Sequence, residues 1–151
     1  MSKTVIADSS CLIGLCKINK LFILEKIFES ILIPEAVYHE VVIKGKGRPG
    51  AEEVKNSDWI EQRKVHNKLA VKALRMNLGP GESEAITLAD ECKADFLILD
   101  DLKARQTAEE LGLSVVGTVA VLKKAREKNM IQSFEAALTD LDNAGFRFSL
   151  Q

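Results

Sequence analysis

Short apolar runs alternate along this chain with stretches whose apolar residues recur every three or four positions. The runs predict buried strands at 3–7, 31–33, 96–99 and 114–116, and an edge strand at 59–65. The helical spacing predicts further segments as helices. One ends at residue 16, one covers 19–28, one begins after Pro34, one covers 69–76, one begins after the turn at 79–81, one ends at residue 112, one covers 118–128, and one lies at the end of the chain. Ser9 and Ser10 suit the N-cap of the first helix. Buried strands alternating with helices indicate an α/β fold with three layers (α/β/α) around a central, mainly parallel sheet.

Length and composition narrow the class of protein. With 151 residues, 46% of them hydrophobic, and a net charge of -1, the chain suits one compact domain over 1–151. No apolar stretch approaches the length of a membrane span, and Asp8 interrupts the N-terminal segment where a secretory signal is apolar, so we expect a cytoplasmic protein. The three cysteines lie in apolar helical patterns and are expected to be buried free thiols, because their spacing matches no zinc site.

Acidic residues follow two of the predicted strands. Asp8 comes directly after the first strand, and Asp100 and Asp101 come after the strand at 96–99. Ligands of open parallel sheets bind beyond the carboxyl ends of the strands. Each of these acids also precedes a helix, so capping of that helix explains any one of them about as well as a site does. Two acidic strand ends in one sheet favour a site.

Further acids border the apolar stripes of two helices. Glu40 lies beside the stripe that contains Val37 and Val41. In the segment GPGESEAITLA, Glu82 shares a stripe with the apolar residues that follow, whereas Glu84 is rotated from that stripe by about 200°. Periodicity therefore favours Glu82 as the residue that faces a site, although a partly exposed Glu40 and favourable charge at a helix N-terminus are the simpler alternatives.

Acids that converge from separate segments repel one another unless cations lie between them. Oxygen-only ligands of this kind suit Mg²⁺ or Mn²⁺. Such ions activate water and stabilise the leaving oxygen when a phosphodiester is cleaved. Sequence spacing does not establish whether the acids meet.

The sequence resembles PIN-domain ribonucleases, and in particular the small prokaryotic PIN proteins that include the toxins of toxin–antitoxin pairs. The resemblance runs through VIADSSCLIGL, PEAVYHEVV, GPGESEAITLA, FLILDDLKAR and VVGTVAVLKKA. It implies a metal-dependent hydrolysis of RNA, with an antitoxin and a second copy of the chain as partners. Residue by residue, it implies that the acids are catalytic and bind Mg²⁺ or Mn²⁺ and that two hydroxyl groups support them. The acids are Asp8, Glu40, Glu82 or Glu84, and Asp101 with its neighbour Asp100; the hydroxyls are Ser10 and Thr118. If the substrate is RNA, Lys103 and Arg105 are the basic residues beside the acid pair that we expect to contact its backbone.

Other basic residues, and other classes of function, also have to be considered for this sequence. Lys44, Lys46 and Arg48 lie in a loop where ordinary solvation explains them, and Arg105 suits either an ion pair with Asp101 or a phosphate contact. The main alternative function is a catalytically silent PIN-like binding module. Phosphotransfer enzymes of the haloacid-dehalogenase or receiver type also use a strand-end Asp, but the former normally has a second Asp where Ser10 stands. A nucleotide-binding loop is disfavoured because the chain lacks G-x-G-x-x-G and G-K-[ST].

Overall fold

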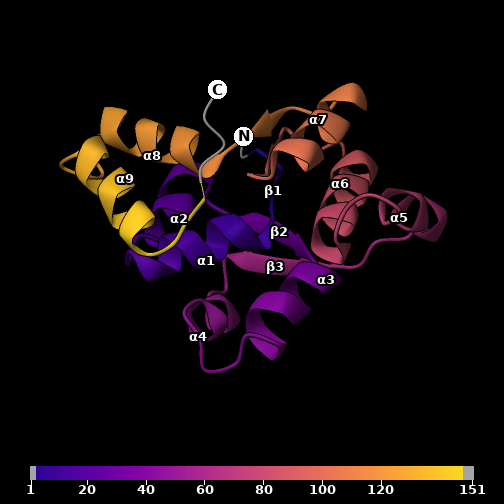
Figure 1. Ribbon diagram of the computed structural model, residues 1–151, viewed down its shortest axis with the longest axis horizontal. Coiled ribbons are helices and arrows are strands. Elements are labelled where there is room, and N and C mark those ends of the chain that lie inside the picture. The colour runs from indigo at the N-terminus through magenta and orange to yellow at the C-terminus, as the bar shows by residue number, and fades with distance from the viewer. Residues whose placement is uncertain (1–2, 148–151) are drawn as a thin grey trace.

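A five-stranded sheet forms the centre of the computed structural model, which describes residues 3–147 (Figure 1). Its strand order is β3-β2-β1-β4-β5, and every neighbouring pair is parallel. The strands are β1 (Val5–Ala7), β2 (Ile31–Pro34), β3 (Ile60–Arg63), β4 (Phe96–Ile98) and β5 (Val115–Val116). β3 is an edge strand, as the sequence predicts, and the three-layer α/β/α fold is confirmed.

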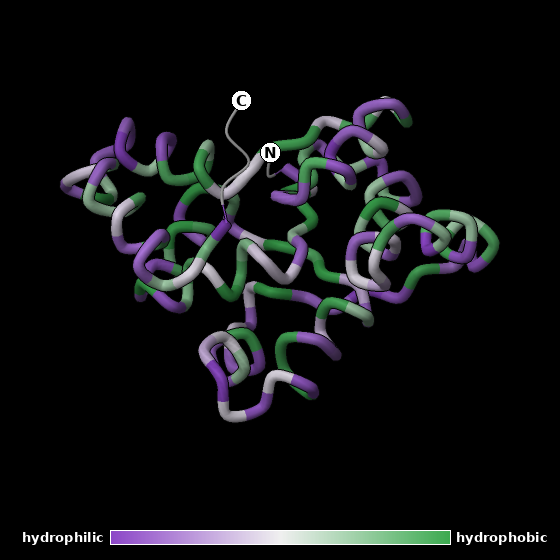
Figure 2. The backbone as a smooth tube through the Cα atoms, viewed as in Figure 1, coloured by the Kyte–Doolittle hydropathy of each residue, from purple (hydrophilic) through white to green (hydrophobic). Residues whose placement is uncertain are grey.

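Helices cover both faces of the sheet. They are α1 (Ser9–Lys17), α2 (Phe22–Phe28), α3 (Glu35–Tyr38), the π-helical turn η1 (His39–Ile43), α4 (Ala51–Lys55), α5 (Lys68–Leu74), α6 (Pro80–Cys92), α7 (Leu102–Glu110), α8 (Thr118–Glu127) and α9 (Phe134–Asn143). Because side chains alternate along a strand, Val5 and Ala7 pack with α1, α2, α8 and α9, whereas Ile6 packs with α6 and α7. Figure 2 shows hydrophobic residues concentrated along the strands and the helix faces that meet them.

Three local features differ from the sequence prediction. Asp8, rather than Ser9 or Ser10, occupies the N-cap position of α1, because β1 leads into the helix without a loop. The helix after Pro34 changes after four residues into the π-helical turn, closed by the bond from Lys44 N–H to the His39 carbonyl. α4 follows the GKGRPG loop where no helix was predicted, because five residues are too few for a clear period.

Burial agrees with most of the predicted stripes. Cys11 and Cys16 are buried free thiols, while Cys92 is half-buried at the end of α6. α5 departs most from its predicted role: none of its residues is buried, and Leu69 and Met76 lie exposed. Within residues 3–147, no helix combines the length and the apolar character needed to cross a membrane.

Candidate functional site

The carboxyl ends of β1 and β4 bring two acids to one edge of the sheet. The two strands are adjacent and parallel, with Ala7 opposite Ile98. Asp8 directly follows β1, and its backbone N–H donates to the Ile98 carbonyl at 3.1 Å. Asp100 follows β4 two residues beyond Ile98 and acts electrostatically on Asp8. This edge is where parallel sheets bind ligands.

Asp8 is an unusually placed carboxylate. Asp8 is buried, with 4% of its surface exposed, and its Oδ1 has no hydrogen-bond partner among the described residues. Burial raises the pKa of Asp8 from 3.8 to about 7; the Ser9 backbone N–H opposes the shift, and the negative charges of Glu82, Glu40 and Asp100 add to it. A buried acid with a free oxygen is stabilised by a proton or by a cation.

Glu40 converges on the same point as Asp8. It lies in η1, and its Oε1 would be 3.1 Å from a Cβ built on Gly81; Oδ1 of Asp8 would be 3.3 Å from the same Cβ. The backbone of Gly81 therefore lies against both carboxylates, and the absence of a side chain there leaves room for them. This glycine belongs to the segment from which sequence periodicity selected only the glutamates.

The two glutamates of the GESE segment have different roles. Glu82 lines the main cleft of the molecule. Its Oε1 accepts a hydrogen bond from Gly79 N–H at 3.2 Å. Burial, together with the charges of Asp101 and Glu40, raises the pKa of Glu82. Glu84 turns to α3, where its Oε1 accepts a bond from Ala36 N–H at 3.0 Å. The structure thus places Glu82 at the cleft, on the side that periodicity favoured, whereas Glu84, which periodicity rotates away, contacts the first turn of α3.

The adjacent residues Asp100 and Asp101 also have different hydrogen-bond partners. Asp100 accepts two bonds from Thr118, at 2.8 Å from N–H and 2.6 Å from Oγ1, and burial raises its pKa. Asp101 is exposed and caps α7, because its Oδ2 accepts a bond from Ala104 N–H at 3.0 Å. Both line a hollow beside the main cleft. Thr118 is thus a direct partner of Asp100, and the capping alternative describes Asp101.

Lys103 and Arg105, the two cations predicted to contact RNA, line neither the main cleft nor the hollow beside it. Arg105 is half-buried; its Nη1 would be 2.9 Å from a Cβ on Gly117, and its charge lowers the pKa of Asp100. Among the described residues the ion pairs are Arg63–Glu61 and His66–Glu91, so the pair of Arg105 with Asp101 is not formed. Lys103 is exposed on α7 and lines neither hollow. Arg105 therefore belongs to the packing around Asp100.

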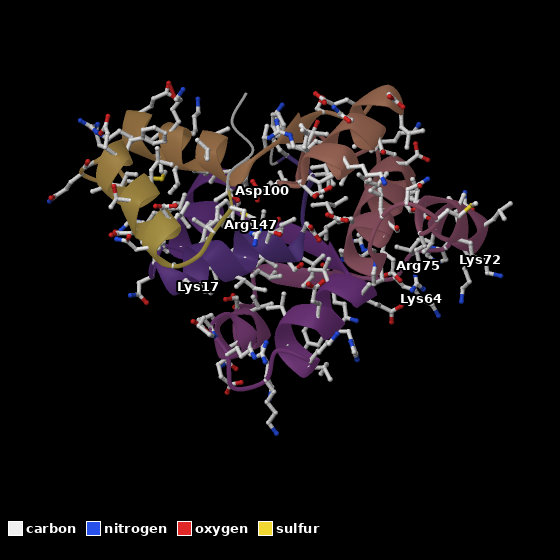
Figure 3. The ribbon with its side chains drawn as sticks, in the orientation of Figure 1. Lys17, Lys64, Lys72, Arg75, Asp100 and Arg147 are labelled. Carbon is white, nitrogen blue, oxygen red and sulfur yellow. The ribbon has the colours of Figure 1, made fainter. Side chains whose placement is uncertain are left out.

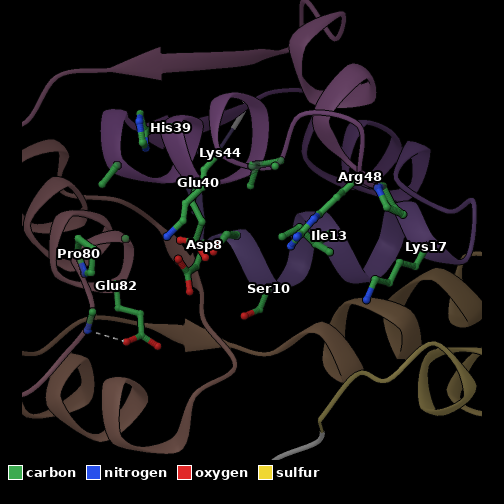
Figure 4. Close-up of a pocket in the computed structure, with 17 residues that line it drawn as sticks. Asp8, Ser10, Ile13, Lys17, His39, Glu40, Lys44, Arg48, Pro80 and Glu82 are labelled. Atoms are coloured by element: carbon green, nitrogen blue, oxygen red, sulfur yellow. Dashed lines mark hydrogen bonds between the residues drawn. The ribbon is translucent and has the colours of Figure 1, made fainter.

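A cleft of about 1050 Å³ opens above the acids, and a smaller hollow of about 450 Å³ shares residues with it. Asp8, Glu40 and Glu82 line the cleft, with Ser10 nearby on α1 (Figure 4). Cations also line both spaces: Lys17, Lys44 and Arg48 in the cleft, and Lys17 and Arg147 in the hollow. Sequence reasoning missed Lys17, which lines the cleft from the last position of α1, and Arg147, which only the fold brings to the hollow from the far end of the described chain.

The donor set fits a divalent cation. Asp8 supplies a buried oxygen without a partner, and the neighbouring donors are carboxylates, the ligands that Mg²⁺ and Mn²⁺ prefer. Across residues 3–147, no three Asp, Glu, His or Cys side chains are already gathered closely enough to share an ion. Asp8, Glu40 and Glu82 line one cleft, and like charges in one cleft disfavour one another's ionised form until a cation neutralises them.

Comparison with known proteins identifies the fold family. The DUF3368 family model, described as a PIN domain, matches residues 4–151. The chain belongs to the PIN-domain family. A solved structure of a PilT N-terminus domain protein from the hyperthermophilic archaeon Sulfolobus solfataricus P2 is similar to it, with a TM-score of 0.60 and 23% identity, covering 81% of this chain and 93% of that one. Comparison with curated proteins gives no match.

Membership of the PIN-domain family indicates the general chemistry of this domain. PIN domains are typically nucleases and generally use divalent metal ions. Its sheet and helices form the PIN nuclease-like fold, and the acidic cleft lies at the edge where parallel sheets bind ligands.

Proposed function

We propose that this PIN domain is a Mg²⁺- or Mn²⁺-dependent endoribonuclease that hydrolyses RNA phosphodiester bonds in the cleft above Asp8. The observation that carries the proposal is the buried, unpartnered Oδ1 of Asp8, with Glu40 converging on the same point beside Gly81. Within residues 3–147 Asp8 has no ion pair, and the negative charges of Glu82, Glu40 and Asp100 raise its pKa further. A cation is the partner that this arrangement lacks.

Asp8, Glu40 and Glu82 are the residues that would hold the ion. When bound, it supplies the neutralising charge and the acidified water that phosphodiester hydrolysis requires. Asp100 has a different part, because both of its oxygens accept bonds from Thr118. That contact fixes its carboxylate beside Asp8 and adds negative charge to the site.

The cations of the cleft suit the substrate backbone. Figure 4 shows the carboxylates at one end, with Arg48 and Lys17 further along α1. Lys44 and Arg48 have no ion pair with any described residue, so their charges are available to phosphate oxygens. The Lys17 ammonium donates a hydrogen bond to the Ala144 carbonyl at 3.3 Å and has no ion pair with a described residue. An RNA strand lying along α1 places its scissile phosphate at the acids and the next phosphates at these cations.

Cleavage of a labelled RNA tests the proposal. Purified protein is incubated with a 5′-labelled single-stranded RNA and Mn²⁺ or Mg²⁺, and the products are separated on a gel. Wild type should give internal cuts that EDTA abolishes, while Asp8→Asn and Glu82→Gln should lose at least a hundredfold in rate. Asp90→Asn, an exposed acid on the same helix as Glu82, is the matched control and should cleave normally.

Calorimetric titration with Mn²⁺ separates this function from a silent binding module. Binding that disappears in Asp8→Asn supports a nuclease. Wild-type protein that neither binds the ion nor cleaves RNA would instead establish the binding module.

The toxin role, with an antitoxin and a homodimer as partners, belongs to the same proposal. Induction of wild type should arrest growth of a bacterial host, and induction of Asp8→Asn should not. Arrest by both variants would separate any toxicity from the acidic site.

A further inference from the structure

α5 and the chain around it form a basic surface that the proposed site does not use. Between Glu61 and Glu82 the sequence contains no Asp or Glu, but it contains Arg63, Lys64, Lys68, Lys72 and Arg75. The rest of the chain has more acidic than basic residues. Positive charge is therefore concentrated in one segment of a protein whose net charge is -1.

Two cations of α5 and its C-cap residue, Arg75, lie in one row. Lys68, Lys72 and Arg75 are four and three positions apart, so they follow one face of the helix at about one charge per 5.4 Å turn. All three are exposed, and within residues 3–147 none of their side chains forms an ion pair or donates a hydrogen bond. Figure 3 shows Lys64, Lys72 and Arg75 gathered on the outer side of the molecule.

The row is not needed for the core. α5 packs on α6 through the half-buried Val71 and Leu74, while no residue of α5 is buried. Figure 1 shows α5 at the periphery, beyond α6 and away from the sheet. Charge spacing and exposure, rather than packing, therefore distinguish this helix.

The surface is also joined to the cleft by a short stretch of chain. Arg75 precedes Glu82 by seven residues, and seven residues span at most about 25 Å. A stacked strand rises about 3.4 Å per nucleotide, so roughly seven nucleotides cover that distance. One continuous strand is long enough to occupy both places.

We propose that Lys68, Lys72 and Arg75 form a second binding surface for the phosphodiester backbone of the RNA, outside the cleft. The inference rests on the proposed nuclease function for the identity of the strand. It predicts that long RNAs bind more tightly than short ones because they reach α5. Exposed Leu69 and Met76 flank the row but are two separate side chains, and lysine is depleted from the centres of protein interfaces, so a nucleic acid fits the surface better than a protein.

Fluorescence anisotropy with a labelled 24-nucleotide RNA tests this surface. Every protein carries Asp8→Asn so that the RNA stays intact. The α5 triple variant Lys68→Gln, Lys72→Gln and Arg75→Gln is compared with an α8 triple variant, Lys124→Gln, Arg126→Gln and Lys128→Gln, which removes the same charge from exposed positions. Thermal melts verify that both are folded.

The α5 variant should bind 10- to 100-fold more weakly near 0.1 M salt. Its slope of log K against log salt should be shallower by about 2, because each lost phosphate contact on a single strand contributes about 0.7. A slope equal to that of the α8 variant would overturn the inference. Equal competition by polyglutamate at matched charge would overturn it too, in favour of an acidic protein partner; competition by DNA of the same sequence supports backbone binding.

Cleavage separates this result from the nuclease proposal. With Asp8 restored, wild type and the α5 variant should cut a dinucleotide at the same rate, since its single phosphodiester lies in the cleft and leaves no further phosphate for α5. The α5 variant should cut the 24-nucleotide RNA more slowly at subsaturating concentration. If wild type cuts neither RNA while the anisotropy difference persists, the nuclease proposal fails and the basic surface stands.

Discussion

Replacing Asp8 with asparagine should stabilise the metal-free protein above pH 7. The folded-state pKa of Asp8 is about 7, against 3.8 for the unperturbed group. Below pH 3.8 the carboxyl is protonated in both states and contributes no difference. Between the two values the unfolded chain ionises while the folded chain keeps its proton, so stability falls as pH rises. Above pH 7 the loss is complete.

The size of the expected stabilisation by Asp8→Asn follows from the pKa shift of Asp8. At about 1.4 kcal/mol per pKa unit, the buried charge costs at most about 4 kcal/mol at pH 8. Asparagine removes the charge but leaves an amide that needs partners, so we expect a gain of about 2–4 kcal/mol. For a chain of this length that gain raises Tm by roughly 5–15 °C. At pH 4 the two proteins should melt within about 2 °C of each other, since the penalty is nearly absent there.

Thermal and urea unfolding in EDTA across pH 4 to 9 measure the difference. A second series with Mn²⁺ is the complementary test: an ion at a hundred times its Kd stabilises wild type by about 2.7 kcal/mol and leaves Asp8→Asn unchanged. Parallel pH curves for the two proteins, with equal responses to Mn²⁺, would refute the reasoning. The burial of Asp8 would then carry no electrostatic penalty and the ion would bind elsewhere.

Three other changes test neighbouring parts of the site. Gly81→Ala places a Cβ 3.1 Å from Glu40 Oε1, so Mn²⁺ binding and RNA cleavage should fall at least tenfold with little change in Tm; Gly79→Ala, whose Cβ would meet Glu82 at 3.6 Å, should retain most activity. Glu84→Gln weakens the cap of α3 and should lower the free energy of unfolding by about 1 kcal/mol in urea, with cleavage kept. Thr118→Val removes the 2.6 Å bond to Asp100 and should slow cleavage, and Thr118→Ser should restore it.

The strands and the strand-end acids could be predicted because their signals are local. Each buried strand is an uninterrupted apolar run, so the positions of Asp8 and Asp100 follow directly from where the runs end. The contrast between Glu82 and Glu84 was also visible, because helical periodicity separates them by about 200°.

The rest of the site depends on contacts between distant segments. Which of Asp100 and Asp101 faces inward is decided by Thr118, eighteen positions away. Arg105 was expected near Asp101 or a phosphate, but packing against Gly117 directs it toward Asp100. Arg147 lines the hollow beside Asp100 and Asp101 although it lies more than forty positions further along the chain. No local pattern encodes these partners.

The first turn of α6 joins three separate structural tasks in four consecutive residues. The backbone of Gly81 defines the space between two carboxylates, Glu82 enters the cleft, and Glu84 secures α3. An insertion or deletion just before Pro80 that rotates this turn would displace all three at once. Substitutions can therefore alter these functions one at a time, whereas a change in chain length here would impair folding and catalysis together.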